Sequence, residues 1–77
     1  MLRVFSIKKK DYDFILCDSN GRKIATWKVN PIKNPEGTVS DQETLESILN
    51  YLQKQNKKCE IITVYPMTYG YEIITRE

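Results

Sequence analysis

The feature that most constrains this chain is the tetrapeptide Ser19-Asn20-Gly21-Arg22, which lies between two segments rich in β-branched and aromatic residues. Asn-Gly tolerates the two positive φ angles of a type I′ turn, whose twist matches that of the flanking strands. If Asn20 and Gly21 form the loop, the pairing of the flanking residues follows by counting outward from it. The sequence therefore predicts a β-hairpin made of residues 12–17 and 23–29.

The predicted register brings together side chains that suit one another. It pairs Phe14 with Trp27, Leu16 with Ala25 and Tyr12 with Val29 on one face; Asp13 with Lys28, Ile15 with Thr26 and Cys17 with Ile24 on the other; and Asp18 with Lys23. An aromatic pair and two pairs of opposite charge each contribute about 0.2–1 kcal/mol. A shift of one residue would exchange the two faces and lose these pairs, so the chemistry supports the register.

A third strand is predicted over residues 2–7, which are also rich in apolar and β-branched types. The turn that follows it, Lys8-Lys9-Lys10-Asp11, contains no glycine. With Lys9 and Lys10 at its tip, Phe5 would lie beside Phe14, and Ile7 beside Tyr12. This arrangement would extend the aromatic face of the hairpin.

Residues 30–39 are predicted to form a loop, because two Asn-Pro steps keep the preceding residues out of the helical region. Ser40 and Glu43 then match a capping box, which predicts a helix from this point to about Lys57. The apolar residues of this helix form a single stripe: Leu45, Ile48, Leu49 and Leu52. A single stripe indicates that the helix covers one face of a sheet.

The last part of the chain is predicted to be a second hairpin, because Glu-Ile-Ile-Thr occurs at 60–63 and again at 72–75. Residues 65–71 would form its turn. The expected fold class is α+β: a two-layer β-β-β-α-β-β arrangement with one helix on one face of an antiparallel sheet, which could be strongly curved. We expect residues 1–77 to form a single domain, since chains this short rarely hold two cores.

The predicted sheet carries more apolar side chains than one helix can cover. The face towards the helix would hold Phe5, Ile7, Tyr12, Phe14, Leu16, Ala25, Trp27 and Val29, and the opposite face Leu2, Val4, Ile15, Cys17 and Ile24. In the second hairpin, Ile61, Thr63, Tyr65, Tyr71 and Ile73 would share one face, and Ile62, Val64 and Ile74 the other. Either the sheet curls around a second small core, or its uncovered face meets a partner. We favour the partner.

We therefore expect a non-enzymatic interaction module that binds a protein partner, or a second copy of itself as a homodimer. The candidate partner-binding residues are Leu2, Val4, Ile15 and Ile24 on the sheet face and Tyr65, Met67, Tyr69 and Tyr71 in the loop. An alternative interpretation of the loop is that Tyr65 and Tyr71 pair across the strands and cover the end of the core.

Nucleic-acid binding is the alternative function, carried by Lys8, Lys9, Lys10 and the loop aromatics. The lysines could equally be a solvated turn that discourages association between sheet edges. The net charge is +2 and the isoelectric point about 8.6, below the value above about 9 that is usual for nucleic-acid-binding domains. If the lysine turn and the tyrosine loop lie at opposite ends of the sheet, this composite site does not exist.

Catalysis, metal binding and cofactor binding are not expected. The chain has no His, and its two cysteines, Cys17 and Cys59, lie far apart in the sequence, which argues against a structural zinc site. No nucleophile has a plausible base beside it, and no glycine-rich phosphate loop is present. Lys54, Lys57 and Lys58 are explained by the dipole of the predicted helix. The few cysteines, and the lack of a signal peptide or an apolar run of membrane length, favour a cytoplasmic protein without a membrane partner.

Overall fold

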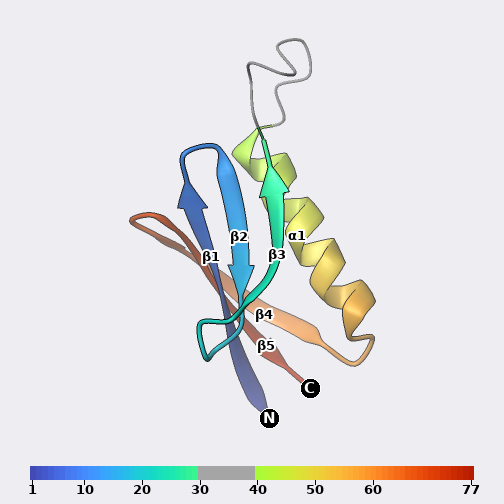
Figure 1. The fold of residues 1–77 in the computed structure, drawn as a ribbon. Coiled ribbons are helices and arrows are strands. Elements are labelled where there is room, and N and C mark those ends of the chain that lie inside the picture. The colour runs from blue at the N-terminus through green and yellow to red at the C-terminus, as the bar shows by residue number, and fades with distance from the viewer. Residues whose placement is uncertain (30–39) are drawn as a thin grey trace.

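The computed structural model describes residues 1–29 and 40–77, and the loop expected at 30–39 lies outside the described residues. The described elements are β1 (Leu2–Lys10), β2 (Asp13–Cys17), β3 (Lys23–Lys28), α1 (Asp41–Gln55), β4 (Glu60–Met67) and β5 (Gly70–Arg76). The expected α+β fold class is confirmed: an antiparallel five-stranded sheet in the order β3-β2-β1-β5-β4 carries α1 on one side (Figure 1). The sheet twists strongly, but it is not closed into a barrel.

The predicted register of the β2–β3 hairpin is confirmed over the body of the strands. The observed pairs are Asp13 with Lys28, Phe14 with Trp27, Ile15 with Thr26 and Leu16 with Ala25. The backbone N–H of Val29 also donates to the carbonyl of Tyr12, as that register requires. The end of the hairpin differs, since Cys17 pairs with Lys23 instead of Ile24 after a register shift.

The predicted two-residue turn at Asn20 and Gly21 is wrong. The Asp18 N–H donates to the Arg22 carbonyl (2.9 Å), so three residues, 19–21, form the loop, and Gly21 alone among them has a positive φ, of 81°. Asp18 faces Arg22 rather than Lys23. Its carboxylate explains the longer loop, because Oδ1 accepts from the N–H groups of Asn20 and Arg22. The extra loop residue and the register shift compensate, which keeps the body of the hairpin in the predicted register.

The predicted turn at Lys9 and Lys10 is also wrong. Lys10 pairs with Asp13, so the turn consists of Asp11 and Tyr12, and Asp11 has a φ of 55°. Aspartate is one of the few residues other than glycine that enters this region readily. All three lysines therefore belong to β1. The observed pairs are Ile7 with Leu16 and Lys9 with Phe14, in place of Phe5 with Phe14 and Ile7 with Tyr12.

The predicted faces of the second hairpin are wrong for the residues of β4 after Ile61, because the strand has a register shift between Ile61 and Thr63. Val64 lies opposite Ile73 and packs against the core together with Ile61, whereas Thr63 and Tyr65 lie on the other face. The bulge inserts one residue, so it reverses the orientation of everything that follows it in the strand.

Helix α1 starts as predicted and ends at Gln55, two residues before the expected Lys57. The Ser40 hydroxyl oxygen accepts a hydrogen bond from the Glu43 N–H (3.2 Å), which caps the first turn. The buried core contains the helix residues Leu45, Ile48 and Leu52 and the strand residues Phe5, Ile7, Phe14, Leu16 and Ile73. The ring of Tyr51 meets Trp27 edge-on, with 5.3 Å between ring centroids, and extends the core towards β3.

The side chain of Glu77 joins the start of β1 to the end of α1. Its carboxylate accepts hydrogen bonds from the Arg3 guanidinium (3.0 Å) and from the side-chain amide of Asn56, the C-cap residue of the helix. These hydrogen bonds, that of Arg3 foremost, lower the pKa of the Glu77 side chain below its ordinary value of 4.5. The ionised form of this carboxyl therefore stabilises the folded state.

We expect Glu77→Gln to lower the free energy of unfolding by a small amount near neutral pH and by less in acid. A carboxyl whose pKa is lowered by folding stabilises the folded state above its unfolded pKa, and this contribution disappears as the pH falls through the folded pKa. Urea unfolding of both proteins between pH 7 and about pH 3 measures the difference. A difference that does not shrink in acid would contradict this assignment.

Candidate binding surface on the outer sheet face

The sheet face turned away from α1, called here the outer face, is not covered by any helix or strand of the described residues (Figure 1). The strand register places its side chains in rows that cross the strands. The rows contain Lys28, Asp13 and Lys10; then Thr26, Ile15, Lys8, Gly70 and Met67; then Lys23, Cys17, Ser6, Glu72 and Tyr65; then Val4, Ile74 and Thr63; and last Leu2, Arg76 and Glu60. The face therefore has a basic end and an apolar end.

The apolar end lies where β1 begins. Leu2 is 63% exposed and Val4 is 37% exposed, and the half-buried Ile74 lies opposite Val4 on β5. Arg76 and Glu60 flank these side chains and form a salt bridge of 3.1 Å. This end thus offers exposed apolar area beside one positive and one negative charge.

The basic end lies where β1 finishes, and it holds Lys8 and Lys10 of β1 and Lys28 of β3 around a single carboxylate, Asp13. The salt bridges among the described residues join Arg3 to Glu77, Lys9 to Asp41 and Arg76 to Glu60, so none involves these three lysines. Their positive charge is available to a ligand.

Lys9 does not belong to this cluster. Its ammonium group lies 2.7 Å from the Asp41 carboxylate at the start of α1 and 5.5 Å from the centre of the Phe14 ring. Both contacts are on the core side of the sheet, because successive residues of a strand point to opposite faces. The predicted set Lys8, Lys9 and Lys10 is therefore divided, with two lysines on the outer face and one against the helix.

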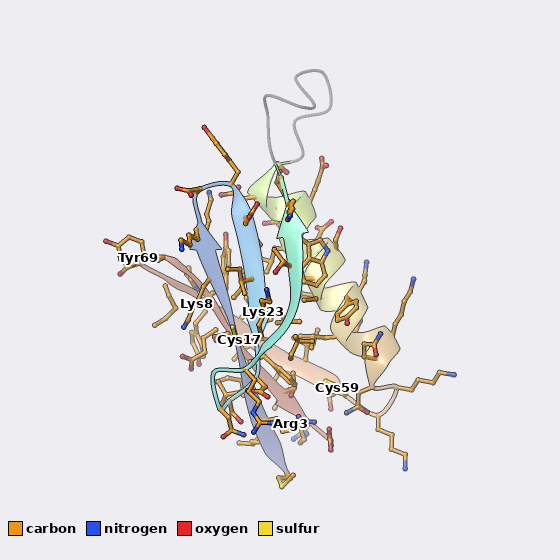
Figure 2. All side chains as sticks on the ribbon, in the orientation of Figure 1. Arg3, Lys8, Cys17, Lys23, Cys59 and Tyr69 are labelled. Carbon is orange, nitrogen blue, oxygen red and sulfur yellow. The ribbon has the colours of Figure 1, made fainter. Side chains whose placement is uncertain are left out.

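The turn between β4 and β5, residues 68 and 69, is called here the tyrosine turn. It lies beside the lysines of β1. The Lys9 N–H donates to the Tyr69 carbonyl (2.7 Å), and Gly70 pairs with Lys8. Figure 2 shows Tyr69 at the tip of the β4–β5 hairpin, at the same end of the sheet as Lys8. The lysines and the tyrosine turn therefore do not lie at opposite ends of the sheet, which a composite site of lysines and aromatic residues requires.

The three other predicted loop residues divide between the two faces of the sheet. Tyr65 and Met67 lie on the outer face, 50% and 56% exposed, and Tyr69 at the tip is 79% exposed. Tyr71 lies opposite Ile7 and packs against the core, so it does not share a surface with the others. Its position agrees with the alternative interpretation, in which it covers the end of the core. Tyr65 faces Glu72 and does not pair with Tyr71.

The middle of the outer face is partly covered by the β2–β3 turn. Cys17 is buried there although it lies on this face, and Ile15 is half-buried. A shallow depression of about 250 Å³ lies between the turn and β1 and is lined by Val4, Phe5, Ser6, Asp18, Ser19, Gly21 and Glu72. Ile24 lies at the register shift, 39% exposed and away from the apolar end. The depression is smaller than the pockets of about 300–1,000 Å³ that usually hold small molecules.

The predicted site lacks several residues of this surface, among them Lys28, Ile74 and Gly70. Lys28 could have been found, because the predicted register already placed it on the same face as Asp13. Ile74 and Gly70 could not, because their positions depend on the pairing of β5 with β1. That pairing joins the two ends of the chain, and no local sequence pattern indicates it.

Neither a metal site nor a helix that could cross a membrane is present in the described residues. Residues 1–29 and 40–77 contain no group of three or more His, Cys, Asp or Glu side chains arranged to hold a metal ion. None of the helical structure described is long and apolar enough to cross a membrane. The chain matches no protein-family model, and it is significantly similar to no curated protein and to no solved structure.

Proposed function

We propose that this protein is a non-enzymatic interaction module that binds a protein partner through the outer face of its sheet. The observation that carries the proposal is the exposed apolar area of that face, above all Leu2 and Val4, over which no described helix or strand lies. An antiparallel sheet that faces water on one side normally presents polar side chains there. Exposed apolar side chains that lie together are typical of a binding surface.

The edges of the sheet are poorer candidates than its face. Strand β4, at one edge, contains Pro66 and a register shift. Strand β3, at the other edge, is short and has a lysine at each end. Proline, bulges and edge lysines all hinder the addition of another strand. Association is therefore directed to the outer face.

The partner that best fits the apolar end is a second copy of this chain. Arg76 and Glu60 lie side by side across the strands there. In a two-fold dimer each surface meets its own copy, so Arg76 of one protomer can pair with Glu60 of the other while the apolar side chains are buried between them. Because the apolar end is small, we expect a weak dimer with a Kd between about 10 µM and about 1 mM.

Sedimentation velocity over a range of protein concentrations tests this proposal. The native protein is expected to show a monomer–dimer equilibrium, and Val4→Glu is expected to remain monomeric, because it would place two carboxylates in the apolar contact. Gln53→Glu is the matched control: it adds the same charge at an exposed position of α1 and should leave the equilibrium unchanged.

A native protein that stays monomeric up to about 1 mM would overturn the homodimer. Equal weakening by the two variants would also contradict it, since that result would indicate an effect of net charge alone. Binding of another protein that Val4→Glu abolishes would retain the interaction surface but replace its occupant.

Nucleic-acid binding is a second candidate function, and one observation favours it: Lys8 and the tyrosine turn adjoin, through the pairing of Lys8 with Gly70 and the bond from the Lys9 N–H to the Tyr69 carbonyl. Cations next to exposed aromatic side chains are the combination that such ligands require. The test is fluorescence anisotropy with labelled DNA and RNA at low salt. No change in anisotropy with any of them would exclude this function.

A cytoplasmic location is proposed as well. Both cysteines carry free thiols, with Cys17 buried and Cys59 half-buried, and free thiols suit a reducing compartment. Alkylation of the denatured protein directly after cell lysis should modify both cysteines. A fraction that reacts only after reduction would argue for an oxidising compartment.

A further inference from the structure

We infer that the basic end of the outer face binds single-stranded nucleic acid in preference to duplex. This inference rests on the second candidate function above and adds the form of the ligand and the residues that hold it. They are Lys8, Lys10 and Lys28 for the phosphates and Tyr65 and Tyr69 for the bases.

The first argument is the number and spacing of the positive charges. Lys8 and Lys10 are two residues apart on β1, hence about 7 Å along the strand, and Lys28 lies two strands away, about 10 Å across the sheet. Three cations this close can follow one phosphate backbone over a few nucleotides. A duplex-binding protein that makes about 6–10 phosphate contacts needs more cations than this end provides.

The second argument is the exposure of the aromatic rings. Tyr69 is 79% exposed and Tyr65 is 50% exposed. Exposed rings stack on unpaired bases, whose flat faces are accessible, but the bases of a duplex are already stacked on one another. Gly70 lies between Lys8 and Met67 in its row and adds no side chain, which leaves room between the lysines and the tyrosine hairpin.

The third argument is the lack of a suitable element for entering a duplex groove. A major groove admits a helix or a two-stranded ribbon. Helix α1 packs its apolar side on the opposite face of the sheet. The tip of the β4–β5 hairpin, Met67-Thr68-Tyr69, has no charged residue. Neither element combines a protruding shape with cations on the outer face. The β1–β2 hairpin carries Lys8 and Lys10, but β5 and β3 flank it almost to its turn, so it is not a free two-stranded ribbon.

Two carboxylates also lie near this site and limit its affinity. Asp13 lies between Lys10 and Lys28, and Glu72 lies opposite Tyr65. The net charge of the lysine cluster with Asp13 is thus +2. We expect modest affinity with a shallow salt dependence: three phosphate contacts on a single strand give a slope of about −2 in a plot of log K against log salt concentration.

The experiment compares one labelled sequence as a single strand and as a duplex, by fluorescence anisotropy at several salt concentrations. The single strand should bind at least about tenfold more tightly than the duplex, and Tyr69→Ala should weaken its binding about fivefold or more. Lys8→Gln and Lys10→Gln should each weaken binding and reduce the salt slope. Lys9→Gln is the matched control, because it removes the same charge from the residue between them but on the other face, and it should bind like the native protein.

The outcomes separate this inference from the function on which it rests. Equal or tighter binding of the duplex would overturn the preference for single strands and leave nucleic-acid binding in place. No binding of either form would overturn both. Binding of polyglutamate as tight as that of the single strand, with no effect of Tyr69→Ala, would show a site that recognises charge alone and would overturn the inference. Equal weakening of binding by Lys8→Gln and Lys9→Gln would contradict a site on the outer face and would overturn the inference.

Discussion

The Gly70→Ala variant is expected to lose about 3 kcal/mol or more of the free energy of unfolding. Gly70 has a φ of 152°, and a Cβ atom built on it would lie 1.8 Å from the carbonyl oxygen of Ile7. That oxygen belongs to the backbone of β1, so relief requires the central strands β1 and β5 to separate. Urea unfolding followed by circular dichroism measures the loss.

Gly21→Ala is the matched control for this prediction. Gly21 also has a positive φ, of 81°, but no atom lies within 4 Å of a Cβ built there. The variant should lose only the cost of the left-handed conformation, about 1–2 kcal/mol. Equal losses in the two variants would show that backbone conformation alone accounts for both, and that the approach of β1 to Gly70 adds nothing to the loss.

The β2–β3 hairpin was predictable from the sequence in its register but not in its turn. The register of β2 and β3 follows from local information, because Asp13 with Lys28 and Phe14 with Trp27 suit only one alignment. The turn does not follow, since it depends on the Asp18 carboxylate, which accepts from two backbone N–H groups and favours a longer loop over the type I′ turn. The hydrogen bonds to Asp18 outweighed the preference of Asn-Gly, and the register shift kept the side-chain pairs unchanged.

The site itself depends on long-range pairing. β1 lies between β2 and β5, although β5 is at the other end of the chain, and this order brings the tyrosine turn next to Lys8. The β4 bulge then decides that Tyr65 faces outwards. Apolar alternation shows only that two faces exist; a one-residue insertion exchanges them, and no residue type marks where it occurs. The sequence therefore predicts the uncovered face, but not the residues that meet on it.

Two neighbouring isoleucines of β5 lie on opposite faces of the sheet, one in the core and one on the outer face. Ile73 is fully buried, opposite Phe5 and Val64, whereas Ile74 is only half-buried, opposite Val4. Ile73→Ala should lower the free energy of unfolding by about 2–5 kcal/mol, because it leaves a cavity in the core. A chain of this length has about 4–12 kcal/mol in total, so the variant will be partly unfolded or close to it.

Ile74→Ala removes the same atoms from the opposite face and should cost about 1 kcal/mol or less, because water can reach its site. It should instead weaken self-association, since Ile74 lies beside Val4 at the apolar end. Urea unfolding at low protein concentration measures stability, and sedimentation measures association. A loss of stability as large as that of Ile73→Ala, with association unchanged, would mean that the outer face acts as a second core of the monomer. In that case a docking surface would no longer be needed to explain its apolar residues.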